Sequence, residues 1–305
     1  MAGDKVRTIV GPTAAGKSAV AMWLADRRRV LIISADSRQV YRRFDVGTAK
    51  PSAAERARVP HRGIDVVEPT KRYSAFAWAA AAAGWIADAA AEAREPLVVG
   101  GTGLYVRALY GPSFDEPALS PARRADLERF LAPFSVDELR RWCAVLDPER
   151  AHLGRTQLLR AVEVALLTGR RLSELHGERA RAPRFVARYL VVDPGPVLHA
   201  QIERRVDGML ARGWEEEVRA LAARVPRDAP AWNATGYRAV REVVDGMLDR
   251  RRARERVIVE TRQYAKRQRT WFRHQLAGAD VTRLDPRDEG SEPASDAWWR
   301  GGTSA

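Results

Sequence analysis

Gly11-Pro12-Thr13-Ala14-Ala15-Gly16-Lys17-Ser18 fits the pattern G-x-x-x-x-G-K-[ST] at every fixed position. The apolar run at 6–10 predicts a strand before it, and 18–26 predicts a helix after it. In this setting glycines let backbone N–H groups surround an anion at a helix N-terminus, where the helix dipole favours negative charge. We therefore expect this octapeptide, the P-loop, to bind phosphate, with Lys17 on the terminal phosphate and Ser18 as a Mg²⁺ ligand.

A second site residue follows the next apolar run. Residues 30–34 predict a buried strand, and Asp36 comes directly after it. Ligands of open α/β sheets bind at the carboxyl ends of strands, so Asp36 is a candidate general base. The alternative is an Asp that caps a helix or closes a turn.

Strands and helices alternate beyond this point. Further strands are expected at 61–67, 97–99 and 186–192, and an alanine-rich helix at about 73–94. A second glycine-rich strand end, at 100–103, includes Thr102. This order predicts an α/β fold with a P-loop-type parallel sheet flanked by helices.

The domain organisation follows from changes in composition. We expect a P-loop core at 1–114, a helical insertion at 115–184 and the second part of the core at 185–288. The Gly- and Ser-rich end, 289–305, is expected to be a flexible tail.

Composition limits the class of protein. The 305 residues carry a net charge of +13, which is compatible with a polyanionic partner, although 47 of the 52 basic residues are arginines, as a GC-rich genome would also produce. Cys143 is the sole cysteine, so intrachain disulfides and cysteine-based zinc sites are excluded. No signal peptide or apolar membrane span is evident, so we expect a cytoplasmic protein.

The last long helix, expected at about 250–275, has two different faces. One face carries a basic stripe that recurs at i, i+4, i+7 and i+11: Arg262, Lys266, Arg269 and Arg273. Val257, Tyr264 and Trp271 recur at heptad spacing on the other. Because no acidic residue follows Glu260 in this helix, we favour contact with a phosphate backbone over a solvated face.

The ordered motifs GPTAAGKS, ADSRQVYRRFDVGTAKP, VVGGTGLYVRAL, RTQLLRAVEV, NATGYRAV and TRQYAKRQRTW resemble those of the bacterial tRNA isopentenyltransferase family over about residues 6–275. The resemblance implies transfer of a dimethylallyl group from dimethylallyl diphosphate to N6 of an adenosine. That adenosine lies immediately 3′ of the anticodon in tRNAs that read codons beginning with U.

The resemblance also implies roles for particular residues. Asp36, Thr13 and Lys17 would be catalytic, and the whole P-loop with Arg205 would bind the diphosphate. Besides the basic stripe, the residues expected to contact tRNA are Asp36, Ser37, Arg38, Gln39, Thr102, Arg124, Gln157, Leu158, Leu159, Arg160 and Ala161. The implied cofactor is Mg²⁺ at Ser18, and the partners are the tRNA anticodon stem-loop and dimethylallyl diphosphate, with the protein acting as a monomer.

Departures from the family pattern leave these positions intact. His61-Arg62 stands where two histidines are common, and Thr235-Gly236-Tyr237 where Ile-Gly-Tyr is usual. Two alternatives stay open: a P-loop small-molecule kinase, and an isopentenyltransferase that acts on free adenine nucleotides. Neither of these two activities needs a basic helix or an insertion that binds RNA.

Overall fold

The computed structural model describes residues 4–112, 119–178, 182–276 and 280–301. It divides into two compact units: unit 1 combines residues 1–110 and 184–305, and unit 2 comprises residues 111–183. The expected start of the insertion, residue 115, lies outside the described residues.

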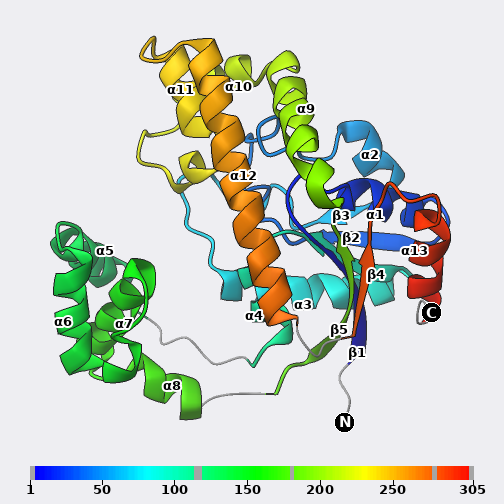
Figure 1. The fold of residues 1–305 in the computed structure, drawn as a ribbon. Coiled ribbons are helices and arrows are strands. Elements are labelled where there is room, and N and C mark those ends of the chain that lie inside the picture. The colour runs from blue at the N-terminus through cyan, green and yellow to red at the C-terminus, as the bar shows by residue number, and fades with distance from the viewer. Residues whose placement is uncertain (1–3, 113–118, 179–181, 277–279, 302–305) are drawn as a thin grey trace. The chain divides into compact units, whose positions relative to one another are not determined.

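Unit 1 is built on a parallel sheet. Within the described residues its six strands lie in the order β3-β2-β4-β1-β5-β6 (Figure 1). They are β1 (Asp4–Val10), β2 (Val30–Ser34), β3 (His61–Arg62), β4 (Glu95–Gly100), β5 (Phe185–Val192) and β6 (Val281–Leu284). On β1, Thr8 pairs with Val98 on one side and Tyr189 on the other. The predicted α/β class and parallel P-loop-type sheet are confirmed.

Helices cover both faces of this sheet. Helix α1 (Lys17–Ala25) connects β1 to β2, and α3 (Ala75–Ala91) connects β3 to β4. The connection from β1 through α1 to β2 moves toward the edge of the sheet formed by β3. The connection from β3 through α3 to β4 moves back from that edge. Because crossovers between parallel strands are right-handed, α1 and α3 lie on opposite faces of the sheet. Such a reversal leaves a crevice at the carboxyl ends of the strands. Short helices α2 (Ala53–Arg58) and α4 (Gly103–Tyr110) complete the first part of the unit.

A helical layer lies between β5 and β6 in the chain. It consists of α9 (Leu198–Ala211), α10 (Trp214–Ala222), α11 (Tyr237–Val244) and α12 (Arg250–Gln275). Gly213, with φ +87°, separates α9 from α10, because a residue in the left-handed conformation ends a helix. The long helix α12 packs against α9 and α11 (Figure 1).

Unit 2 is helical throughout its regular structure in the described residues. Its helices are α5 (Pro121–Leu131), α6 (Val136–Leu146), α7 (Arg155–Thr168) and α8 (Leu172–Glu178). They enclose a separate core that includes Leu139, Cys143 and Val162, each fully buried. Residues 111–183 contain 12 arginines and 11 acidic residues, so this unit carries only +1 of the chain's net charge of +13.

Two local predictions were wrong. The strand expected over 61–67 is regular only at β3, because the following segment turns through Gly63 and Asp65, both with positive φ. The expected flexible tail contains α13 (Ser291–Arg300). Its Trp298 and Trp299 are 1% and 4% exposed, so burial of two indole rings holds the segment on unit 1.

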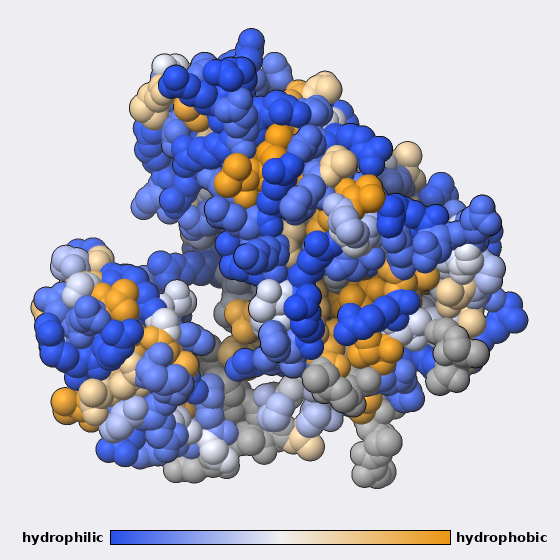
Figure 2. Space-filling model, in the orientation of Figure 1, coloured by the Kyte–Doolittle hydropathy of each residue, from blue (hydrophilic) through white to orange (hydrophobic). Residues whose placement is uncertain are grey.

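The surface agrees with the charged composition. In Figure 2 the face over α9, α11 and α12 is mainly hydrophilic, with small apolar patches. None of the helices in the described ranges has the length and apolar character to cross a bilayer.

Candidate functional site

The P-loop joins the end of β1 to the start of α1. Gly11 has φ +147°, and a Cβ there would lie 2.1 Å from the carbonyl oxygen of Val192, so only glycine fits. Gly16, with φ +93°, precedes the first residue of α1. The loop therefore turns its backbone at a helix N-terminus, where unpaired N–H groups favour an anion.

Lys17 is held inside its own loop. Its Nζ donates to the carbonyl oxygens of Gly11 at 3.0 Å and Pro12 at 2.6 Å. Burial, assisted by the charge of Arg205, lowers the pKa of Lys17 from 10.5 to about 7, while Asp36 and Asp193 oppose the shift. The hydrogen-bond partners of the Lys17 amine are neutral carbonyls. An anion bound in the loop would supply the negatively charged partner that favours the protonated form.

Arg205, on α9, lines two cavities that flank the loop. Burial lowers the pKa of its guanidinium, and Asp36 opposes that effect. The outer cavity, of about 700 Å³, is also lined by Ser18 and Arg212. Arg205, Arg212 and the P-loop helix thus line one space, which suits a phosphate-bearing ligand.

The inner cavity is a narrow slot of about 60 Å³. Thr13 and Asp36 both line it, and so do apolar side chains from α9, α10 and α12: Val206, Met209, Trp214 and Val257. Tyr264 also lines the slot, and burial, followed by the charge of Asp36, raises its pKa to about 12, so it remains a neutral phenol. The slot combines a carboxylate, a hydroxyl and an apolar wall.

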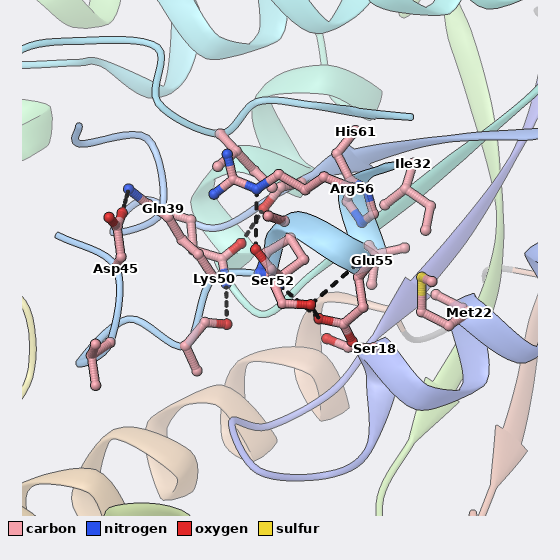
Figure 3. A pocket seen from close by; sticks show the side chains of 18 of the residues that line it. Ser18, Met22, Ile32, Gln39, Asp45, Lys50, Ser52, Glu55, Arg56 and His61 are labelled. Carbon is pink, nitrogen blue, oxygen red and sulfur yellow. Dashed lines mark hydrogen bonds and ion pairs between the residues drawn. The ribbon is translucent and has the colours of Figure 1, made fainter. Parts of the chain in front are cut away.

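An ion-pair network forms the far wall of the outer cavity (Figure 3). The Lys50 ammonium, whose side chain is 1% exposed, donates to Asp45 at 2.6 Å and to Asp65 at 2.5 Å. Arg56 donates to Asp65 at 2.7 Å. Although burial opposes it, these bonds lower the pKa of Asp65. No local pattern in the sequence indicates this network, because Asp65 lies 15 residues after Lys50 in the chain.

The strand-end residues predicted from the sequence lie together. Asp36 Oδ1 accepts from the backbone N–H of Arg38 at 2.8 Å, so the turn geometry considered as an alternative is present, yet the side chain still lines the slot. The Ser37 N–H donates to the Thr102 hydroxyl at 3.0 Å. Gln39 is engaged internally, accepting from Ser34 at 2.9 Å and donating to the Thr48 carbonyl at 3.3 Å.

The basic stripe of α12 divides into two pairs. Arg262 forms an ion pair with Glu203, and Arg269 binds Asp193 with an Nε–Oδ2 distance of 2.8 Å. The carboxylates come from α9 and from the residue after β5, so the lack of acidic residues after Glu260 in α12 does not leave these two arginines without partners. Lys266 and Arg273 are exposed and form no ion pair among the described residues. In the part of the chain that the structure describes, only these two members of the stripe present uncompensated charge.

In unit 2, most of the predicted RNA-contacting residues have internal partners. Arg124 and Arg160 both pair with the carboxylate of Glu163, which is 5% exposed. Gln157 accepts from the backbone N–H of Gly154 at 3.2 Å at the start of α7. Leu158 and Ala161 are completely buried in the unit's core, and Leu159 is half-buried, so packing accounts for the apolar members of the set.

Sequence reasoning missed one buried polar residue of unit 1. Gln268 on α12 is 6% exposed, and its amide contacts the P-loop at Thr13 and the glycine-rich strand end at Gly101. The signal was present, because Gln268 falls between Ala265 and Phe272 on the packed face of the helix. A polar residue at a core position of an amphipathic helix requires buried partners.

The chain is similar to known proteins over most of its length. A family model described as IPP transferase matches residues 39–275, and one described as isopentenyl transferase matches residues 4–61. The chain is 45% identical to a tRNA dimethylallyltransferase of Alkalilimnicola ehrlichii, over 88% of this chain and 87% of that protein. It is 41% identical to one of Stenotrophomonas maltophilia, over 94% of both chains.

Solved structures are also similar. A tRNA isopentenylpyrophosphate transferase from Bacillus halodurans superimposes with a TM-score of 0.68 and 32% identity, covering 97% of this chain and 95% of that one. A eukaryotic dimethylallyltransferase captured acting on tRNA has the same fold, with a TM-score of 0.79 at 24% identity, covering 98% of this chain and 80% of that one.

Proposed function

Because the chain belongs to the IPP transferase family, we propose that it transfers the dimethylallyl group of dimethylallyl diphosphate to the N6 amine of an adenosine in tRNA. The acceptor is the adenosine immediately 3′ of the anticodon, in tRNAs that read codons beginning with U. The observation that carries the proposal is the slot, which Thr13 of the P-loop, Asp36 and Arg205 all line.

The reaction breaks the bond between C1 of the dimethylallyl group and the diphosphate oxygen, and forms a bond between C1 and N6. Negative charge accumulates on the departing diphosphate. The P-loop N–H groups, Lys17 and Arg205 are proposed to stabilise that charge, because preorganised groups of this kind commonly supply the largest catalytic contribution. The Thr13 hydroxyl is proposed to donate to the bridging oxygen.

The N6 amine is a poor nucleophile, because its lone pair is conjugated with the adenine ring. Asp36 is proposed to accept its proton as the new bond forms, which makes this carboxylate the general base. Because the adenosine is stacked in the anticodon loop, it must be extruded to reach the slot. We propose that the turn of Ser37 and Arg38, which a hydrogen bond to Thr102 holds, receives the extruded base.

Mg²⁺ is the proposed cofactor. The described residues contain no cluster of three or more metal-ligating side chains. Mg²⁺ binds readily through one protein oxygen together with waters and substrate phosphates, so an exposed Ser18 hydroxyl at the start of α1 fits this ion. When bound, the ion would neutralise charge on the diphosphate oxygens.

The partner surface is proposed to include the exposed cations of α12, Lys266 and Arg273, which can contact phosphates without releasing an internal carboxylate. Arg124 and Arg160 would contact RNA from unit 2 while paired to Glu163. We propose that the protein acts as a monomer in the cytoplasm.

One experiment tests the proposal. The protein is incubated with dimethylallyl diphosphate, Mg²⁺ and unmodified tRNA, and the digested RNA is examined by mass spectrometry. We expect adenosine to gain C5H8, and expect none in the Lys17→Ala control. In parallel reactions, product when AMP replaces tRNA, with none on tRNA, would favour the free-nucleotide alternative, and phosphate transfer from added ATP would favour the kinase.

A further inference from the structure

A single buried amide connects two strand ends of the site. Gln268 Oε1 accepts from the backbone N–H of Thr13 at 2.8 Å, and its Nε2 donates to the carbonyl oxygen of Gly101 at 2.8 Å. Thr13 follows β1 and Gly101 follows β4, which is the neighbour of β1 in the sheet. Both hydrogen-bonding ends of the amide are therefore used to fix the distance between these two loops.

The fit around this amide is close. A Cβ at Gly101 would lie 2.2 Å from Gln268 Nε2, so the amide reaches the carbonyl only because this position is glycine. The Thr13 peptide is part of the P-loop, while the Thr13 side chain lines the slot with Asp36. The orientation of the Thr13 peptide, and with it the direction of the hydroxyl, thus depends on Gln268.

The same helix is tied to a third strand end. The next residue, Arg269, binds Asp193 directly after β5, the other neighbour of β1. Helix α12 is therefore attached to the carboxyl ends of β4, β1 and β5 through two successive side chains. Lys266 and Arg273 of the basic stripe, which form no ion pair with any residue that the structure describes, are exposed to an arriving polyanion.

We propose that Gln268 is a positioning residue for the transfer step, which holds Thr13 in its reactive orientation and couples RNA binding on α12 to the diphosphate loop. The inference rests on the proposed function. Gln268 itself contacts neither the departing oxygen nor the amine. When bound RNA displaces α12, the two hydrogen bonds of this amide transmit the displacement to the P-loop and change its affinity for diphosphate. By reciprocity, a bound diphosphate changes the affinity of the protein for RNA.

The first test uses the chemistry of the amide. In Gln268→Glu, a protonated carboxyl can still accept from Thr13 and donate to Gly101, whereas an ionised one has no proton for the carbonyl. We expect kcat at saturating donor to be about 10²-fold below wild type at pH 8 and to recover relative to wild type toward pH 6. Gln268→Met, of similar size, loses both bonds and is expected to stay slow at every pH.

The outcomes are separable. Recovery of the Glu variant toward pH 6, together with a Met variant that is slow at every pH, supports the proposal. A Met variant with wild-type kcat, or a Glu variant that recovers at no pH, overturns it. If wild-type protein does not prenylate tRNA at all, the proposed function fails instead.

The second test measures coupling without turnover. Affinity for inorganic pyrophosphate with Mg²⁺ is measured with and without saturating tRNA. In wild type we expect tRNA to change this affinity by about 5-fold or more, and in Gln268→Met by a factor near one. Gln275→Met, an exposed glutamine of the same helix, is the control and should behave as wild type. Coupling that persists in Gln268→Met, or is absent from wild type, contradicts the proposed link.

Discussion

Arg269 on α12 holds Asp193 at the end of β5 through both a terminal nitrogen and Nε. Its charge is thereby compensated within unit 1, as is that of Arg262 by Glu203. The four cations of the basic stripe should therefore contribute unequally to RNA binding, although they share one face of the helix.

This difference gives the first prediction. Replacing Lys266 and Arg273 together by Gln should flatten the plot of log affinity against log salt by about 1–2 units, because each lost phosphate contact removes slightly less than one released counterion. The matched variant Arg262→Gln/Arg269→Gln should leave the slope nearly unchanged. Filter binding across a salt series measures both. Equal slopes for the two double variants would contradict the division of the stripe.

The second prediction concerns Asp36. Asp36→Asn keeps the shape of the side chain and removes its basicity, so turnover should fall by about 10²–10⁴-fold. Affinity for tRNA should change little, because the loss affects the transfer step. Single-turnover prenylation measures the rate, and Asp26→Asn, an exposed aspartate, is the control. Near-normal turnover in Asp36→Asn would remove Asp36 from the role of base.

The third prediction follows from the lowered pKa of Lys17, about 7 in the ligand-free protein. A bound diphosphate favours the protonated amine, so binding at pH 8 should take up about one proton more in wild type than in Lys17→Arg, which is always charged. Calorimetry in two buffers of different ionisation enthalpy measures the uptake. Equal uptake by the two proteins would contradict the lowered pKa.

The same shift predicts a pH dependence of stability. The unfolded chain, with its lysine pKa near 10.5, binds more protons than the folded one between pH 7 and 10.5. The contribution of Lys17 to the free energy of unfolding should therefore rise with pH in that window, and its unfavourable effect is fully present below pH 7. Lys17→Met should be more stable than wild type at pH 6 and converge with it at high pH. Chemical denaturation at several pH values tests the sign.

The fourth prediction concerns Glu163, the shared partner of Arg124 and Arg160. Glu163→Gln should weaken the local stability of α7 by about 1–3 kcal/mol, because two guanidinium groups lose a buried carboxylate. Hydrogen exchange of α7 amides measures this. Glu174→Gln, whose carboxylate is half-exposed and pairs with Arg171, is the control and should have little effect.

The fifth prediction concerns α13. Truncation after residue 289 removes Trp298 and Trp299 and leaves Arg7 and Arg28 without the Trp299 ring that both approach. We expect Tm to fall by roughly 10 °C, whereas truncation after residue 301 should have no effect. Thermal unfolding by circular dichroism compares the two. Equal Tm values would mean that the helix adds nothing to stability.

The sequence predicted those parts of the fold and of the site that a short run of consecutive residues determines. The P-loop, the apolar strands and Asp36 after β2 each follow from a few consecutive residues. Pairings between distant segments could not be predicted in this way: Arg269 and Asp193 are separated by 76 residues, and Thr13 and Gln268 by 255. The prediction of a flexible tail was wrong because it relied on the Gly- and Ser-rich composition at the start of the segment. The two consecutive tryptophans further along it indicate burial instead.

The uneven distribution of charge between the two units has a kinetic consequence. Long-range attraction sets how fast a polyanion arrives, and short-range contacts set how long it stays. Because unit 2 is nearly neutral, the rate at which tRNA arrives should be governed by unit 1 and should fall with ionic strength. Unit 2 can then influence residence time alone, so changes in it should alter product release without altering capture.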